Sequence, residues 1–189
     1  MDAASPRQRF ADIVKRGERR LDLAEAALVI AQEEYPLLEM EPYLSRLDEM
    51  GKRVRGQLSH RGDPLAGLAA LNKVLFKEEK FRGNEEEYYD PRNSFLNEVL
   101  DRKTGIPITL SLLAMEVGRR AGLPLAGVGL PGHFIVTYLS PSRSFWIDPF
   151  DQGRLLSERD CEQMVKRIYD GRVPFRRELM RPVSVFAIL

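Results

Sequence analysis

The longest run of this chain without a formal charge extends from Ala121 to Ser142. A helix of that length could cross a bilayer. Four glycines and three prolines interrupt the run, however, and these residues do not sustain a long helix. The run therefore predicts short buried strands joined by turns, and it argues against a membrane partner.

The hydrophobic pattern changes at this run. Before it, apolar residues recur every three or four positions, which is typical of amphipathic helices. Helices are predicted from Ser5, from about Pro42, from Asp63-Pro64, from Ser94 to about Lys103 with Gly105 as the stop, from Pro107 to about Ala121, and from Ser157. Strands are predicted at 125–128, 133–139 and 144–147, with a turn at Pro141-Ser142 before the last. The pattern indicates an α+β fold in which helices pack on a small antiparallel sheet.

Three parts of the chain are expected. Residues 1–80 form a helical N-terminal segment packed on the core, residues 81–175 form the core, and residues 176–189 begin a further helical extension that is cut off. The boundary at Phe81 is placed where a loop rich in charged and turn-forming residues begins. A chain of 189 residues can bury one sizeable core without disulfides or metals.

Charge and cysteine content exclude several kinds of partner. The 29 basic and 28 acidic residues leave a net charge of +1, so no general field attracts nucleic acid. One cysteine, Cys161, and two histidines, His60 and His133, make neither a disulfide nor a zinc site, and no cofactor is expected. The N-terminus lacks the apolar segment of a secretory signal, which favours the cytoplasm.

Three motifs between residues 105 and 148 follow a recognisable order. They are a helix start (GIPITLS), a strand with His133 (GHFIVTY) and a strand that ends at Asp148 (FWID). This order resembles the transglutaminase-like, papain-related superfamily, whose members place a catalytic cysteine at the helix start, a histidine base on one strand and an orienting aspartate on the next. The resemblance puts the cysteine position at Pro107, so it implies that the nucleophile is missing.

Longer runs of sequence are similar to a narrower family. LFKEEKFRGNEEEYYDPRNSFLNEVLDRKTGIPITLS, PGHFIVTY and IDPFDQGRLLS resemble the SirB-one family of bacterial proteins, which is named for a proposed regulatory role. Its domain also occurs in a eukaryotic F-box protein. The resemblance implies that Pro107 is the family's normal residue and that a tetratricopeptide region follows, because the ending RPVSVFAIL resembles the start of that region.

Each candidate residue also has a structural interpretation. His133 and Asp148 are either a remnant of a catalytic triad or a hydrogen-bonded structural histidine and a turn-capping aspartate. Ser111 lies four residues after Pro107 on the same helix face, where it could replace the thiol as a nucleophile with His133 as its base. We expect its hydroxyl instead to bond the carbonyl of Pro107. Cys161 occupies an apolar position of its helix and is expected to be buried and inert.

A loop before the core helices holds a second candidate site. It contains a polar and aromatic cluster made of Tyr88, Tyr89, Asp90, Arg92 and Asn93. Such a loop can bind a ligand. The same residues can equally serve as turn and helix-cap chemistry, and the sequence leaves the two interpretations open.

The sequence therefore predicts a non-catalytic regulatory or protein-interaction module, with a protein partner that it does not identify. The alternative is a hydrolase or acyltransferase that uses Ser111 with His133 and Asp148. A hydroxyl within hydrogen-bond reach of His133 would favour the enzyme, and an apolar wall at Pro107 would favour the module.

Overall fold

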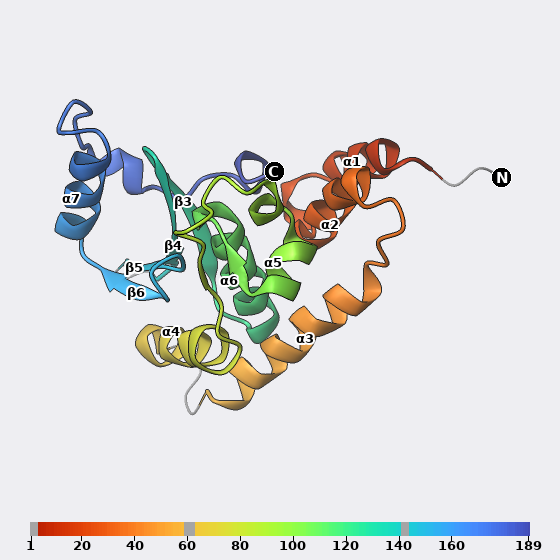
Figure 1. The fold of residues 1–189 in the computed structure, drawn as a ribbon. Helices are drawn as coiled ribbons and strands as arrows, with labels where there is room; N and C mark the ends of the chain where they lie inside the picture. The colour runs from red at the N-terminus through yellow and green to blue at the C-terminus, as the bar shows by residue number, and fades with distance from the viewer. Residues whose placement is uncertain (1–3, 59–62, 141–143) are drawn as a thin grey trace.

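The N-terminal helices begin where their capping residues predict. The structure, a computed structural model, describes residues 4–58, 63–140 and 144–189 (Figure 1). Ser5 caps α1 (Pro6–Lys15) through a capping box with Gln8, and Gly17, at φ +78°, allows the chain to turn before α2 (Leu23–Glu34). A short 3₁₀ turn, η1 (Glu18–Arg20), lies between them.

Two further helices complete the N-terminal part. They are α3 (Glu41–Gly56) and α4 (Pro64–Asn72), and Asp63 caps α4 by accepting a hydrogen bond from Leu65 N–H. The chain continues from α4 as a π-helical segment, η2 (Lys73–Glu78). The helix predicted after Asp63-Pro64 is therefore present, but its second half is a π-helix, in which each N–H bonds the carbonyl five residues earlier.

The helix predicted before α6 is present and ends near Lys103 as expected, but its start and its stop residue differ. A 3₁₀ turn, η3 (Pro91–Ser94), precedes α5 (Leu96–Arg102), and Lys103, at φ +60°, ends α5. Gly105 was the predicted stop. It belongs instead to β2 (Thr104–Gly105), which pairs in parallel with β1 (Arg82–Gly83). α6 (Pro107–Ala121) follows and ends at Gly122, which has φ +84°.

The main sheet has four antiparallel strands in the order β3-β4-β5-β6. They are β3 (Leu125–Leu130), β4 (His133–Tyr138), β5 (Phe145–Asp148) and β6 (Arg154–Leu156), of which β6 was not predicted. The predicted turn at Pro141-Ser142 lies outside the described residues. α7 (Glu158–Ile168), capped by Ser157, follows the sheet, and two 3₁₀ turns, η4 (Arg177–Met180) and η5 (Val185–Ala187), lie near the C-terminus.

Both faces of the sheet are covered, which explains why residues 121–142 carry no charge. Phe134, Val136 and Tyr138 of β4 belong to the large core around α6, whereas Ile135 belongs to a second cluster with Cys161 of α7. The large core also contains residues of α2, α3 and α4, so a single apolar cluster crosses the expected boundary at residue 80. In Figure 1, α6 lies centrally, between the sheet and the N-terminal helices. Among the described residues no helix is long and apolar enough to span a membrane.

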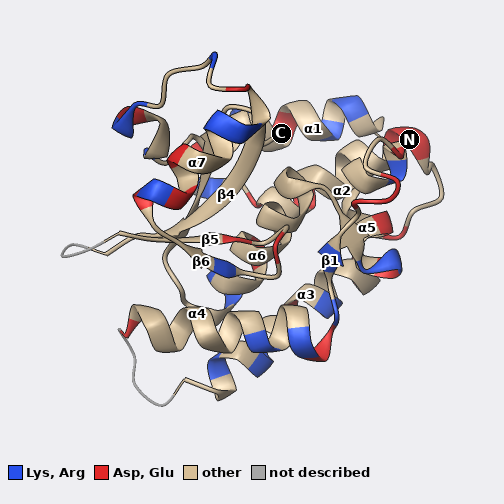
Figure 2. Cartoon of the chain, turned by 60° about the vertical axis from the view of Figure 1, so that its left-hand side comes forward, with Lys and Arg blue, Asp and Glu red and all other residues tan. Residues whose placement is uncertain are grey.

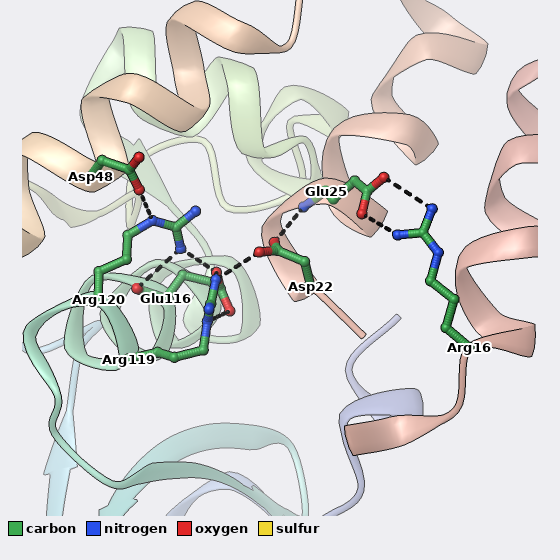
Figure 3. Close-up of polar contacts among 7 residues, drawn as sticks. All are labelled: Arg16, Asp22, Glu25, Asp48, Glu116, Arg119 and Arg120. Carbon is green, nitrogen blue, oxygen red and sulfur yellow. Dashed lines mark hydrogen bonds and ion pairs between the residues drawn. The ribbon is translucent and has the colours of Figure 1, made fainter. Parts of the chain in front are cut away.

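An ion network joins the C-terminal end of α6 to two N-terminal helices (Figure 3). Glu116 is 3 % exposed and accepts hydrogen bonds from Arg119, at 2.9 Å, and from Arg120. Arg119 also binds Asp22, the cap of α2, at 2.7 Å, and Arg120 binds Asp48 of α3 at 2.6 Å. The network therefore fixes α2 and α3 on the core helix.

Candidate active-site remnant and adjoining loop

The start of α6 is held by backbone and hydroxyl hydrogen bonds. Pro107 is buried at the first helical position, where its missing N–H leaves no hydrogen bond unmade. The hydroxyl of Thr109 accepts from Ile106 N–H at 3.1 Å and donates to the carbonyl of Asn93 at 2.8 Å. The helix start is thus tied to the loop that precedes it.

His133 and Asp148 converge across neighbouring strands. His133 opens β4, Asp148 closes β5, and the two strands run antiparallel. His133 Nε2 lies 2.8 Å from Asp148 Oδ2, and their side chains are 11 % and 5 % exposed. Two residues that lie 15 positions apart in the sequence are therefore in hydrogen-bond contact.

Asp148 also shapes the turn that follows β5. Its Oδ1 accepts from the N–H groups of Phe150, at 3.0 Å, and Asp151, at 3.4 Å. Its carbonyl accepts from Gly153 N–H at 2.7 Å. The same carboxylate therefore caps a turn and binds the imidazole.

The imidazole of His133 has one uncommitted nitrogen. A carboxylate that binds Nε2 favours the tautomer with the proton on Nε2, which leaves a lone pair on Nδ1. No hydrogen bond to Nδ1 is formed within the described part of the chain. The ring of Phe150 meets the imidazole edge to face, with centroids 6.1 Å apart. Nδ1 is therefore available as a hydrogen-bond acceptor on an imidazole that Asp148 orients and Phe150 contacts.

Ser111 does not bond the carbonyl that was expected. Its hydroxyl is fully buried and donates to the carbonyl of Phe134 at 3.3 Å, not to that of Pro107. The reason is tertiary: α6 lies directly on β4, and the strand offers an acceptor that helix geometry alone does not reveal. This bond places Ser111 beside the residue after His133, but it directs the hydroxyl proton to the backbone.

The five candidate residues of the loop, at positions 88, 89, 90, 92 and 93, differ in burial and in their contacts. Asn93 is fully buried, and its amide donates to the carbonyls of Glu87, at 2.7 Å, and Tyr88, at 3.2 Å. Asp90 caps η3 and pairs with Arg92 and Arg102, and the hydrogen bond from Arg92 lowers the pKa of Asp90 to about 2. Tyr88 and Tyr89 face solvent, at 38 % and 93 % exposure. Asn93 and Asp90 therefore stabilise the conformation of the loop, and the two tyrosines are its solvent-exposed aromatic side chains.

Comparison with known proteins places the chain in a family. Residues 41–189 match the sequence profile of the transglutaminase-like superfamily. The chain belongs to that superfamily. This agrees with the sequence-based prediction of a transglutaminase-like α+β fold.

Curated relatives of this transglutaminase-like chain come from bacteria and from mammals. A UPF0162 protein of Xylella fastidiosa strain 9a5c is 38 % identical over 162 residues, which are 86 % of this chain and 58 % of that protein. A UPF0162 protein of Vibrio cholerae is 31 % identical over 75 % of this chain and 53 % of its own length. F-box only protein 21 of Mus musculus is 37 % identical over 52 % of this chain and 17 % of its own length. No solved structure matches.

The environment of Cys161, the only cysteine of this transglutaminase-like chain, does not activate its thiol. Cys161 is fully buried on α7, and burial raises the pKa of its thiol to about 11. The prediction of a buried cysteine is confirmed. Within the described part of the chain no group of three histidine, cysteine, aspartate or glutamate residues could hold a metal ion.

The positions of His133 and Asp148 depend on two further residues, Phe150 and Asn72, which the sequence analysis did not identify. Phe150 covers His133, and Asn72 donates from its side chain to the carbonyl of Gly153 at 2.7 Å, which holds the turn after Asp148. Asn72 lies at the end of α4, 81 residues before Gly153. The only sequence signal for this contact was the glycine itself, which has φ +75° and has no room for a side chain beside Asn72.

Proposed function

We propose that this transglutaminase-like chain is a non-catalytic regulatory or protein-interaction module of the SirB-one type. The observation that carries the proposal is the residue at the start of α6. His133 and Asp148 keep the spacing of a base and its orienting carboxylate, at 2.8 Å, while Pro107 offers a buried ring without a nucleophilic atom. A base without a nucleophile beside it cannot form a covalent acyl intermediate.

The environment of Ser111 supports the same proposal. Its hydroxyl is fully buried and donates to Phe134 O, so attack on a substrate would require a new rotamer and the loss of that bond. A buried hydroxyl without access to solvent does not meet a substrate carbonyl. The helix start is therefore a packed surface.

The distribution of the scaffold also favours a module. The matched part makes up 17 % of mouse F-box only protein 21 and 58 % of the Xylella UPF0162 protein. A domain that occurs as one part of different longer proteins is suited to binding a partner, while other parts of those proteins act on that partner.

One observation favours the alternative function. His133 Nδ1 has no hydrogen-bond partner among the described residues, and the other ring nitrogen, Nε2, is held by the carboxylate of Asp148, so the imidazole is oriented with one nitrogen left to accept a proton. A hydrolase or acyltransferase would use Ser111 as the nucleophile after its side chain had rotated toward this nitrogen.

The two functions are separated by a serine-directed covalent probe. We expect a fluorophosphonate to leave the wild-type protein unlabelled, and the variants Ser111→Ala and His133→Ala to give the same background. Hydrolysis of nitrophenyl esters should likewise be equal in all three proteins. Labelling that is lost in both variants, together with ester turnover that depends on them, would establish the hydrolase.

The module itself is tested by partner capture in the native host. A partner crosslinked to the full-length protein should still be captured by His133→Ala, because no chemical step is needed. It should be lost when Tyr89 in the exposed loop is replaced by Ala. Loss of the partner in His133→Ala alone would instead indicate that capture requires catalysis.

A further inference from the structure

A series of aromatic contacts connects solvent to the partly buried imidazole of His133. Tyr89 is 93 % exposed and meets Tyr88 edge to face, with centroids 5.3 Å apart. Tyr88 meets Phe150 at 6.0 Å, and Phe150 meets His133 at 6.1 Å. Exposed tyrosines that rest on other aromatic rings are typical of the residues that dominate protein interfaces.

The loop that carries the tyrosines is held in place by the side-chain amides of Asn93, which is buried, and Asn84, which is partly buried. Asn93 donates to two of its carbonyls, and Asn84 donates to Asn93 Oδ1 at 2.9 Å. Asn84 Oδ1 also accepts from Glu87 N–H at 3.1 Å. Because these bonds already order the loop, a partner would pay little conformational entropy to bind it.

A cavity of about 250 Å³ lies beside the loop. It is lined by residues 82–86, Thr104, Phe150, Asp151 and Gln152. Phe150 is shared with the aromatic series, and its ring lies so close to Gly83 that a Cβ there would be 2.6 Å from it. The cavity and the two tyrosines therefore adjoin the same ring.

The charge of this cavity is acidic. Glu85, Glu86 and Asp151 line it, with Arg82 as the opposing cation. Asp151 pairs with Arg154 at 3.3 Å, and among the described residues neither Glu85 nor Glu86 forms an ion pair. The chain as a whole carries a net charge of +1, and Figure 2 shows acidic and basic residues interspersed over its helices. The negative charge is therefore local to this surface.

We propose that the cavity and the Tyr88-Tyr89 loop bind an extended protein segment that carries lysine or arginine. One cationic side chain enters the cavity beside Glu85 and Glu86, and a neighbouring cation or apolar side chain lies on the ring of Tyr89. The proposal rests on the interaction module proposed above and names the chemistry of its partner. Charge complementarity selects the basic segment, and the ordered aromatic loop supplies the contact area.

The test is a binding titration with a defined probe. A short fluorescein-labelled peptide of alternating lysine and glycine is titrated with the wild-type chain at low salt, and anisotropy is recorded. We expect saturable binding that weakens as salt is added, and none with the matched peptide of alternating glutamate and glycine. The paired variant Glu85→Gln/Glu86→Gln should bind about tenfold more weakly, and Tyr89→Ala several-fold more weakly.

A matched pair of substitutions controls for net charge. Glu49→Gln/Glu162→Gln removes the same charge at exposed positions that do not line the cavity, and its affinity for the lysine peptide should equal that of the wild type. Equal weakening by both pairs, or no saturable binding by the wild type, would overturn the inference.

The peptide titration and the ester-turnover assay together separate this inference from the proposed function. Serine-dependent turnover with intact peptide binding would reject the non-catalytic module and keep the basic-segment site. Absence of turnover with absence of peptide binding would keep the module and reject the site.

Discussion

The two ends of α6 both carry polar groups, but they use them differently. At the C-terminal end, Glu116 is bound by Arg119 and Arg120, and these arginines are bound in turn by Asp22 and Asp48 (Figure 3). Every charge there meets an opposite charge. Near the N-terminal end, Ser111 bonds to Phe134 O, next to His133 in the chain. His133 pairs with Asp148, and one imidazole nitrogen stays free within the described residues.

The difference separates a structural cluster from a candidate site. A buried network that satisfies all its members stabilises one arrangement of the elements that it joins. A pair that keeps a free acceptor next to an ordered, exposed loop retains the capacity to interact. The C-terminal network holds the N-terminal helices, while the pair near the N-terminal end of α6 adjoins, through Phe150, the cavity and tyrosine loop for which we propose a binding role.

The largest effect is expected at the closed network. Glu116→Ala leaves Arg120, whose side chain is 11 % exposed, without its nearest counter-ion. The free energy of unfolding should fall by about 3 kcal/mol, because Arg120 then keeps only Asp48, whose side chain is 57 % exposed, as a counter-ion and loses its buried one. Urea denaturation followed by circular dichroism measures the change.

An exposed ion pair supplies the control for that experiment. Glu33 pairs with Arg7 at 2.9 Å, and their side chains are 40 % and 86 % exposed. Glu33→Ala should lower stability by less than about 1 kcal/mol. Similar losses in both variants would show that the network does not fix the helices.

The next effect concerns the helix start. Pro107→Cys, in a Cys161→Ala background, should preserve the fold and place a thiol at the N-terminus of α6. The helix dipole and a protonated His133 both favour the thiolate, so the pKa of the new thiol should lie below the free value of about 8.5, by about one unit. The pH dependence of alkylation by iodoacetamide measures this pKa.

Removing the histidine sharpens the result. In a His133→Ala background the lowering should be smaller, since only the dipole remains. A thiol that titrates like free cysteine in both backgrounds would show that Pro107 does not occupy the catalytic position. Burial raises the pKa of the Cys161 thiol to about 11. In the wild-type protein this thiol should therefore be alkylated far more slowly at neutral pH than the new thiol at position 107 in either background.

A smaller effect is expected from the residue that holds the turn after Asp148. Asn72→Ala removes the hydrogen bond to Gly153 O and should lower the free energy of unfolding by about 1 kcal/mol. Amide exchange should accelerate at Phe150 and Asp151, whose N–H groups bind Asp148. Unchanged exchange at these amides would mean that the turn is ordered without Asn72.

The smallest effect is a pH dependence at the loop. Hydrogen bonding from Arg92 lowers the folded-state pKa of Asp90 to about 2, below its ordinary value. A depressed pKa contributes stability above the unfolded-state value, and this contribution is lost as the pH falls from about 4 through 2. Asp90→Asn should therefore flatten the wild-type decline in unfolding free energy over that interval. Asp170→Asn, in an exposed pair with Arg172, is the control.

Local chemistry made much of the fold predictable. Ser5 and Pro6 start α1, Pro107 starts α6 and Ser157 caps α7, as their residue types indicate. The predicted end of α5 at about Lys103 is also confirmed, but the residue that stops the helix is Lys103 and not Gly105. Gly105 is engaged in β2, whose pairing with β1 local sequence did not reveal.

The candidate site divides along the same line. The sequence by itself determined that Pro107 stands at a helix start, that Cys161 follows an apolar helix pattern, and that His133 and Asp148 fall in successive strands, because each depends on neighbours only a few residues away. Only the tertiary structure decided that Ser111 bonds to β4 and that Asn72 reaches Gly153. Those contacts depend on which helix packs on which strand. Side-chain hydrogen bonds between distant segments leave no periodic trace in the chain.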